Sequence, residues 1–108
     1  MKGLDIPTGL TRQGQSAAEA ITAFLKEREA DNTGGCRAFY SPEEWAERGE
    51  AYGLTSALIV VHDGGDHAPY FNLDYCAYDA WQRMQDHLQE HGVYAEQCTG
   101  WYSAVYPV

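Results

Sequence analysis

The chain has 108 residues, 44% of them hydrophobic, and a formal net charge of −9 at pH 7. This length is typical of one domain, and the apolar content is sufficient for a core without a disulfide or a structural metal. The first 37 residues hold five acidic and five basic residues, so the whole excess lies in residues 38–108, where eleven acidic residues accompany only Arg48 and Arg83. A field of this sign repels nucleic acid and attracts cationic partners, so direct nucleic-acid binding is not expected.

The composition also argues against a membrane or secreted protein. The longest apolar run, residues 57–61, is far shorter than the roughly 20 residues of a membrane span. The first ten residues lack the apolar segment of a signal peptide. Cys36, Cys76 and Cys98 are widely spaced and odd in number, which favours reduced thiols. The sequence therefore predicts a cytoplasmic protein with no membrane association.

The first half of the chain carries signals for two helices and a short strand. Residues 1–15 are rich in glycine and have no apolar period, so we expect a flexible N-terminal lead-in. A capping box, Ser-Ala-Ala-Glu, opens an expected helix over 16–30. A short strand is expected over 36–40. A second capping box, Ser-Pro-Glu-Glu, has proline at the first helical position and opens a helix expected to end at Gly53.

The middle of the chain predicts a strand, a turn and a returning strand. Residues 55–62 are rich in β-branched side chains and contain the continuous apolar run 57–61, which is typical of a strand buried on both faces. The Asp-Gly-Gly-Asp sequence at 63–66 favours a tight turn. We therefore expect residues 70–73 to return as the second strand of a hairpin, with Pro69 at its start.

The last third predicts a helix followed by a hairpin. Asp74 is expected to cap a helix over 75–91, whose apolar stripe repeats at helical spacing. Residues 93–98 and 101–105 alternate around a Thr-Gly turn and predict a terminal hairpin. The complete order predicts an α+β fold, a mostly antiparallel sheet of about four or five strands with two or three helices packed on one face. We expect one compact domain over 16–108.

The segment His-Asp-Gly-Gly-Asp-His at 62–67 is the first candidate site. A hairpin here would place His62 and His67 side by side, with Asp63 and Asp66 next to them. Imidazole and carboxylate ligands suit a divalent metal such as zinc. The same residues are also what a tight turn needs, because glycine and aspartate tolerate positive φ. Two interpretations stay open, a metal-binding or catalytic site and a structural turn.

A second candidate is His-Leu-Gln-Glu-His at 87–91, which matches the H-x-x-E-H pattern of inverted zinc peptidases. His87 and His91 share a helix face, which is a spacing for metal ligands. The pattern lies on the last helical turn, however, and Leu88 belongs to the core stripe, so a solvated helix end is the simpler interpretation. All four histidines would converge only if the end of this helix returned to the 62–67 turn.

Tyrosines crowd into the acidic part of the chain and suggest a third kind of site. Aromatic side chains are enriched at protein interfaces, although they also favour half-buried strands. We expect an acidic, tyrosine-bearing face that binds a partner and includes Glu43, Glu44, Glu47, Tyr94, Tyr102 and Tyr106.

The sequence thus favours a small non-enzymatic binding or accessory protein that docks on a basic protein partner. Its sharper version is a nucleic-acid mimic, because size, acidity and the lack of catalytic motifs are similar to those of small phage inhibitors. The alternative is a small metal-binding domain or metal-dependent enzyme that uses the 62–67 turn. Otherwise no cofactor is expected. A homodimer through the edge strands of the C-terminal hairpin is compatible with either interpretation.

Overall fold

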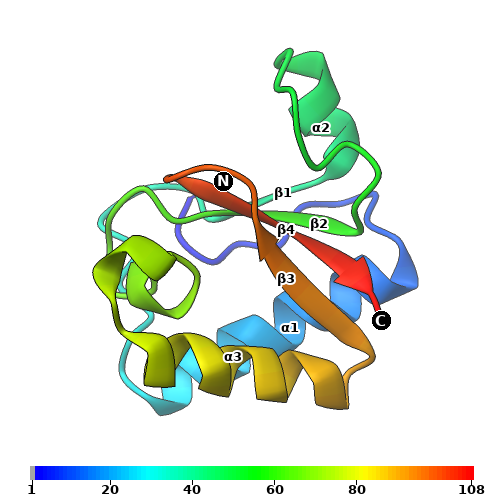
Figure 1. Cartoon of the computed structure of the whole chain (residues 1–108). Coiled ribbons are helices and arrows are strands. Elements are labelled where there is room, and N and C mark those ends of the chain that lie inside the picture. Colours follow the sequence, from blue (N-terminus) through cyan, green and yellow to red (C-terminus); the bar gives the residue numbers. More distant parts are fainter. Residues whose placement is uncertain (1) are drawn as a thin grey trace.

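The computed structural model describes residues 2–108 and contains, in that range, three α-helices and one four-stranded antiparallel sheet (Figure 1). The predicted α+β class is confirmed. No helix within these residues has the length and apolar character needed to cross a membrane. The elements in chain order are α1 (Arg12–Glu27), β1 (Phe39–Tyr40), α2 (Pro42–Glu47), β2 (Leu58–Val61), the 3₁₀ turns η1 (Ala68–Tyr70) and η2 (Leu73–Tyr75), α3 (Tyr78–Glu90), β3 (Val93–Gln97) and β4 (Tyr102–Pro107).

The strands lie in the order β1-β2-β4-β3, and each neighbouring pair is antiparallel. The predicted hairpin of β3 and β4 is confirmed, with Tyr94 opposite Tyr106. β2 is buried on both faces, as its continuous apolar sequence predicted. Because side chains alternate along a strand, Val60 joins the core on one face while Ile59 joins the cluster on the other.

The larger core lies between the sheet and helices α1 and α3, which cover the same face (Figure 1). Leu25 of α1 packs there with Met84 and Leu88 of α3, as helical spacing of apolar residues requires. Gly14 lets α1 approach the sheet closely. A Cβ at this position would overlap the carbonyl oxygen of Ala57, just before β2.

Helix α2 lies on the opposite face of the sheet, which we call the outer face. Trp45 of α2 is fully buried there, with its ring centroid 4.9 Å from that of Tyr102. The predicted capping box is confirmed, since Ser41 Oγ accepts from the Glu44 amide at 3.1 Å. The helix ends at Glu47, before the predicted Gly53. Because Trp45 is the buried residue of this six-residue helix, it is the main attachment of α2 to the sheet.

The N-terminal segment differs from the expectation. Helix α1 begins at Arg12 rather than at Ser16, and Thr11 caps it by accepting from the Gly14 amide at 3.1 Å. The chain before it packs against the main core through Leu4, Ile6 and Leu10. Its backbone also bonds to the segment that precedes β1, with the Gly3 amide 2.9 Å from the Cys36 oxygen. Residue 16 is therefore not a boundary of the folded unit, because it lies inside a helix.

The predicted returning strand over 70–73 is wrong. This segment forms η1 and the start of η2 instead. The second neighbour of β2 is β4, so the strand that was expected close in sequence comes from the end of the chain. Asp74 is not the cap of α3, which begins at Tyr78 with Ala77 as its N-cap residue.

Candidate functional site

The fold buries both histidines of the 62–67 segment. His62 is 1% exposed and His67 is fully buried. Nε2 of His62 lies 2.9 Å from Ser103 Oγ, and Nε2 of His67 lies 2.8 Å from the Val61 carbonyl oxygen. Both rings pack against Phe71, with centroid distances of 6.0 and 6.5 Å. The two imidazoles are therefore part of the interior and not of a surface turn.

Burial keeps both imidazoles neutral at pH 7. Burial, reinforced by the neighbouring His67, lowers the pKa of His62 from 6.5 to about 4. Burial likewise lowers the pKa of His67, against the opposing effects of the Val61 hydrogen bond and Asp66. Neither Nδ1 atom has a hydrogen-bond partner within the protein. Neutral rings are the form in which imidazole binds metals, so the position of the other donors decides whether a metal site exists.

The two carboxylates of the segment do not join the imidazoles. Asp63 and Asp66 are exposed, whereas both histidines are buried. Across residues 2–108, no three side chains of the types His, Cys, Asp and Glu are grouped to hold a metal ion. The glycines serve the turn itself, since Gly65 has φ +86° and a Cβ there would lie 2.7 Å from the Thr33 carbonyl carbon. These contacts favour the structural interpretation of the segment.

The second histidine pair lies elsewhere. Nε2 of His87 donates to the Ala20 carbonyl oxygen at 3.1 Å, and the His87 ring packs 5.1 Å from that of Phe24 in α1. His91 follows α3 and lies exposed, with its ring 5.1 Å from that of His87. The four histidines do not form one group, because His62 and His67 pack against Phe71 whereas His87 packs against α1.

The structure adds a Ser–His contact that the sequence analysis did not single out. Ser103 and His62 come from β4 and from the residue after β2, far apart in the sequence and adjacent in the sheet. A serine bonded to a histidine is part of the arrangement that activates a nucleophile. Both side chains are 1% exposed, and His62 Nδ1 has no carboxylate to orient it. A substrate cannot reach this hydroxyl, so the contact is structural.

The tyrosines predicted to bind a partner divide into core and surface. Tyr102 is 1% exposed and packs against Trp45, so it is unavailable to a partner. Tyr94 is 41% exposed. Its ring centroid lies 5.9 Å from that of Tyr106, the residue opposite it in the sheet. Glu96 is exposed two residues along β3 and therefore shares their face.

The loop after α2 extends this surface. Gly53 packs over β4, since a Cβ there would lie 3.1 Å from the Ala104 Cβ. Two large side chains beside it, Tyr52 and Leu54, are 59% and 42% exposed. We define the tyrosine face as Tyr52, Leu54, Tyr94, Glu96 and Tyr106.

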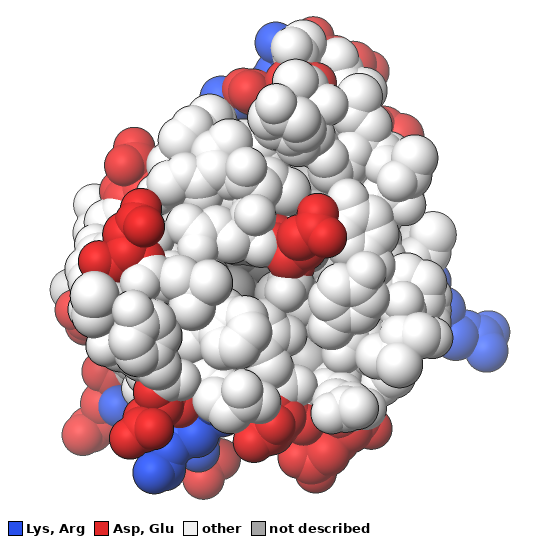
Figure 2. All heavy atoms as spheres, in the orientation of Figure 1, with Lys and Arg blue, Asp and Glu red and all other residues white. Residues whose placement is uncertain are grey.

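Charge is distributed unevenly around this face. In Figure 2 the surface over β3 and β4 is mainly uncharged, with one acidic group within it and further acidic groups along the margins, including the lower margin over α3. The proximity of Glu96 and Tyr106 also has an electrostatic effect. Burial, Cys98 and Glu96 together raise the pKa of Tyr106, which keeps its hydroxyl neutral.

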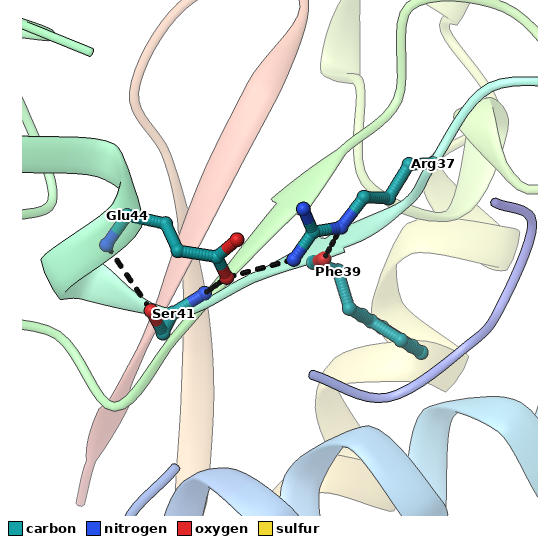
Figure 3. Close-up of polar contacts among 4 residues, drawn as sticks. All are labelled: Arg37, Phe39, Ser41 and Glu44. Atoms are coloured by element: carbon teal, nitrogen blue, oxygen red, sulfur yellow. Dashed lines mark hydrogen bonds and ion pairs between the residues drawn. The ribbon is translucent and has the colours of Figure 1, made fainter. Parts of the chain in front are cut away.

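The three glutamates of α2 that were predicted to bind a partner have different environments. Glu43 and Glu47 are exposed. Glu44 instead accepts from the Ser41 amide at 3.0 Å and from the Arg37 guanidinium at 2.7 Å (Figure 3). Partial burial disfavours its ionisation, but these two donors outweigh that effect and lower the pKa of Glu44. Glu44 is thus engaged within the protein, and only the other two glutamates are free to meet a partner.

Side chains cover both edges of the sheet. On the β1 edge, Arg37 Nε donates to the Phe39 carbonyl oxygen at 2.8 Å (Figure 3). On the β3 edge, the Gln85 amide of α3 accepts from the Ala95 N–H at 3.0 Å and donates to the Ala95 carbonyl at 2.8 Å. Unpaired edge groups are templates for another strand. A second chain that paired with β3 would have to displace Gln85.

Comparison of the chain with protein-family models, with curated proteins and with solved structures found no match. The candidate sites therefore rest on the geometry described above.

Proposed function

We propose that this chain is a non-enzymatic binding protein whose tyrosine face docks on a basic protein partner. The observation that carries the proposal is the exposure of three large side chains, Tyr52, Leu54 and Tyr94, together with the exposed Glu96 on the outer face of the sheet. Interfaces commonly combine an aromatic centre with a polar rim, and their most important residues are often tyrosines.

The charge balance supports a cationic partner. Of the two basic residues in 38–108, Arg48 lies 4.5 Å from the Trp45 ring and pairs with Glu50 at 3.3 Å. The other, Arg83, lies on α3 beside Asp86 and Glu90 in a groove between α1 and α3. Neither cation belongs to the tyrosine face, where Glu96 is the charged member. A positively charged surface would therefore be attracted to this side of the molecule.

The metal-dependent alternative has weaker support. It needs His62 and His67 to turn toward carboxylates, yet their Nε2 atoms are engaged by Ser103 and by the Val61 carbonyl. The nucleic-acid-mimic version remains a finer form of the main proposal. It predicts that the partner binds DNA and that duplex DNA competes with this chain for it.

Affinity capture with a face variant tests the proposal. The intact chain is immobilised and exposed to a cell lysate at low and then rising salt, beside a Leu54→Ser/Tyr94→Ser variant. The matched control is Leu73→Ser/Tyr75→Ser, because these residues are 37% and 51% exposed around η2, outside the tyrosine face. We expect a basic protein that the intact chain and the control retain, that the face variant loses, and that salt releases because charge-driven binding is screened.

Two results would contradict the proposal. One is that no basic protein is retained at low salt. The other is that the face variant and the η2 control retain the same protein equally well, which would place the contact elsewhere. Release of the retained protein by added duplex DNA supports the mimic form, and its continued binding in excess DNA argues against that form alone.

A further inference from the structure

The protein binds its own arginines by one recurring arrangement on the outer face. The Arg37 guanidinium carbon lies 4.0 Å from the centroid of the Tyr40 ring, while its Nη2 pairs with Glu44 at 2.7 Å. Arg48 repeats the combination, with Trp45 as the ring and Glu50 as the carboxylate. Each cation is thus held by an aromatic face and a carboxylate at the same time.

The β3–β4 hairpin, at the end away from its turn, also combines aromatic rings with a carboxylate. Tyr94 and Tyr106 are cross-strand partners whose ring planes meet at 31°. Glu96 lies diagonally across from Tyr106 on the same face, close enough to affect the hydroxyl of that tyrosine. In the described part of the chain, the cation–π contacts fall on Phe24, Tyr40, Trp45 and Trp101, and none falls on this tyrosine pair.

We propose that Tyr94, Tyr106 and Glu96 form a receptor for an arginine side chain of the basic partner. This inference rests on the proposed function and specifies which chemical group the tyrosine face recognises. A guanidinium is planar and weakly hydrated, so it stacks on a tyrosine ring while its N–H groups donate to a nearby carboxylate. A lysine ammonium is compact and strongly hydrated, and it gains less from the same site.

The discrimination between arginine and lysine is the measurable consequence. Fluorescently labelled oligo-arginine and oligo-lysine peptides of equal length are titrated into the intact chain at low ionic strength, and the two dissociation constants are compared. Both peptides sense the overall negative charge equally, so their ratio isolates the guanidinium. We expect the arginine peptide to bind more tightly by about two- to five-fold, the range of an exposed cation–π contact.

Three variants locate the effect. Glu96→Gln and Tyr94→Leu alter exposed side chains, so the fold is retained, and each should bring the arginine-to-lysine ratio close to one. Glu47→Gln removes the same charge from the exposed side of α2 and should leave the ratio unchanged. Thermal melting of each variant checks that the protein is folded before the titration is interpreted.

The inference fails if the intact chain binds both peptides equally, or if Glu96→Gln and Glu47→Gln weaken the arginine peptide to the same extent. Either result would mean that diffuse charge alone attracts the cations. The proposed function could still hold in that case, because the capture experiment with the Leu54→Ser/Tyr94→Ser variant reads it separately. Loss of the arginine preference in Glu96→Gln and Tyr94→Leu but not in Glu47→Gln supports the receptor.

Discussion

At the scale of single residues, the buried imidazoles of His62 and His67 couple the stability of the protein to pH. The pKa of His62 falls from 6.5 in the unfolded chain to about 4 in the folded protein because burial disfavours its charged form. Between these values the unfolded chain binds a proton that the folded protein does not. The contribution of His62 to the free energy of unfolding is therefore fully present above pH 6.5 and is lost as the pH falls toward 4. The full shift corresponds to roughly 3 kcal/mol.

A His62→Gln variant tests this coupling. Glutamine keeps a polar group near Ser103 but does not titrate, so the free energy of unfolding should fall less between about pH 7 and about pH 5 than in the intact chain. Urea denaturation at the two pH values measures the difference. His91→Gln is the control, because His91 is exposed and its loss should preserve the intact slope. An identical decrease in the His62→Gln variant and the intact chain would contradict the account.

The sequence predicted a tight hairpin turn at 63–66, but the chain continues into η1 without a returning strand, and the burial of the two histidines was not predicted. Glycine and aspartate supply a local signal, and Gly65 does lie where backbone segments meet. The burial of His62 depends on Ser103, a residue 41 positions away, and no local pattern contains that contact. The same limit applies to Tyr102, which the sequence placed on a partner-binding face and which is buried by contacts with distant residues such as Trp45 of α2.

At the scale of elements, α2 depends on one side chain for its attachment. It has six residues, too few for a stable isolated helix, and Trp45 is its buried residue. The Trp45 ring contacts Tyr40, Trp101 and Tyr102 at centroid distances of 5.0, 5.6 and 4.9 Å. The helix therefore forms together with the outer face of the sheet.

Truncation of this anchor should release α2. Trp45→Ala is expected to lower the free energy of unfolding by about 3–5 kcal/mol, as for other large aromatic truncations in a core. Chemical denaturation gives the value, and hydrogen exchange should show faster exchange in α2. Glu47→Ala on the exposed side of the same helix should change stability by less than about 0.5 kcal/mol. A Trp45→Ala cost below about 1 kcal/mol would show that α2 has another attachment.

The covered edge of β3 leads to a prediction about self-association. Gln85→Ala removes both hydrogen bonds to Ala95 and leaves the edge open, at a cost of about 1–2 kcal/mol. We expect the variant to form dimers as its concentration rises, measured by size-exclusion chromatography with light scattering. Gln89→Ala, an exposed position on the same helix, should behave like the intact chain. Equal association in all three proteins would mean that Gln85 does not protect this edge.

Elements that depend on local interactions were predicted correctly, whereas those that depend on distant contacts were not. The capping box at Ser41, the buried strand and the terminal hairpin are encoded within a few residues, and all three are present. Helix α1 begins after Thr11 instead of at the predicted Ser16, and the additional turn includes the long-range contact of Gly14 with Ala57. The pairing of β2 with β4 joins distant parts of the chain, so the local turn signal pointed to the wrong partner.

At the scale of the whole molecule, the tyrosine face combines exposed aromatic side chains with the carboxylate of Glu96, on a chain with a formal net charge of −9. The basic residues on the outer face are engaged by rings and carboxylates of the protein itself. In Figure 2 most of the visible acidic groups lie along the margins of the mainly uncharged surface over β3 and β4. We therefore expect charge to attract the partner from a distance and the tyrosines to determine where it docks, so that salt slows association more than it alters the contact.

Oxidative footprinting of the tyrosines tests the docking face most directly. The chain is labelled with hydroxyl radicals alone and in complex with the basic protein that it captures, and each tyrosine is read by mass spectrometry. Tyr52 and Tyr94 belong to the tyrosine face. Tyr75 in η2 and Tyr78 at the start of α3 are 51% and 61% exposed and serve as internal controls. The account predicts that the partner protects Tyr52 and Tyr94 and leaves Tyr75 and Tyr78 reactive. Protection of Tyr75 and Tyr78 with Tyr52 and Tyr94 unchanged would contradict it.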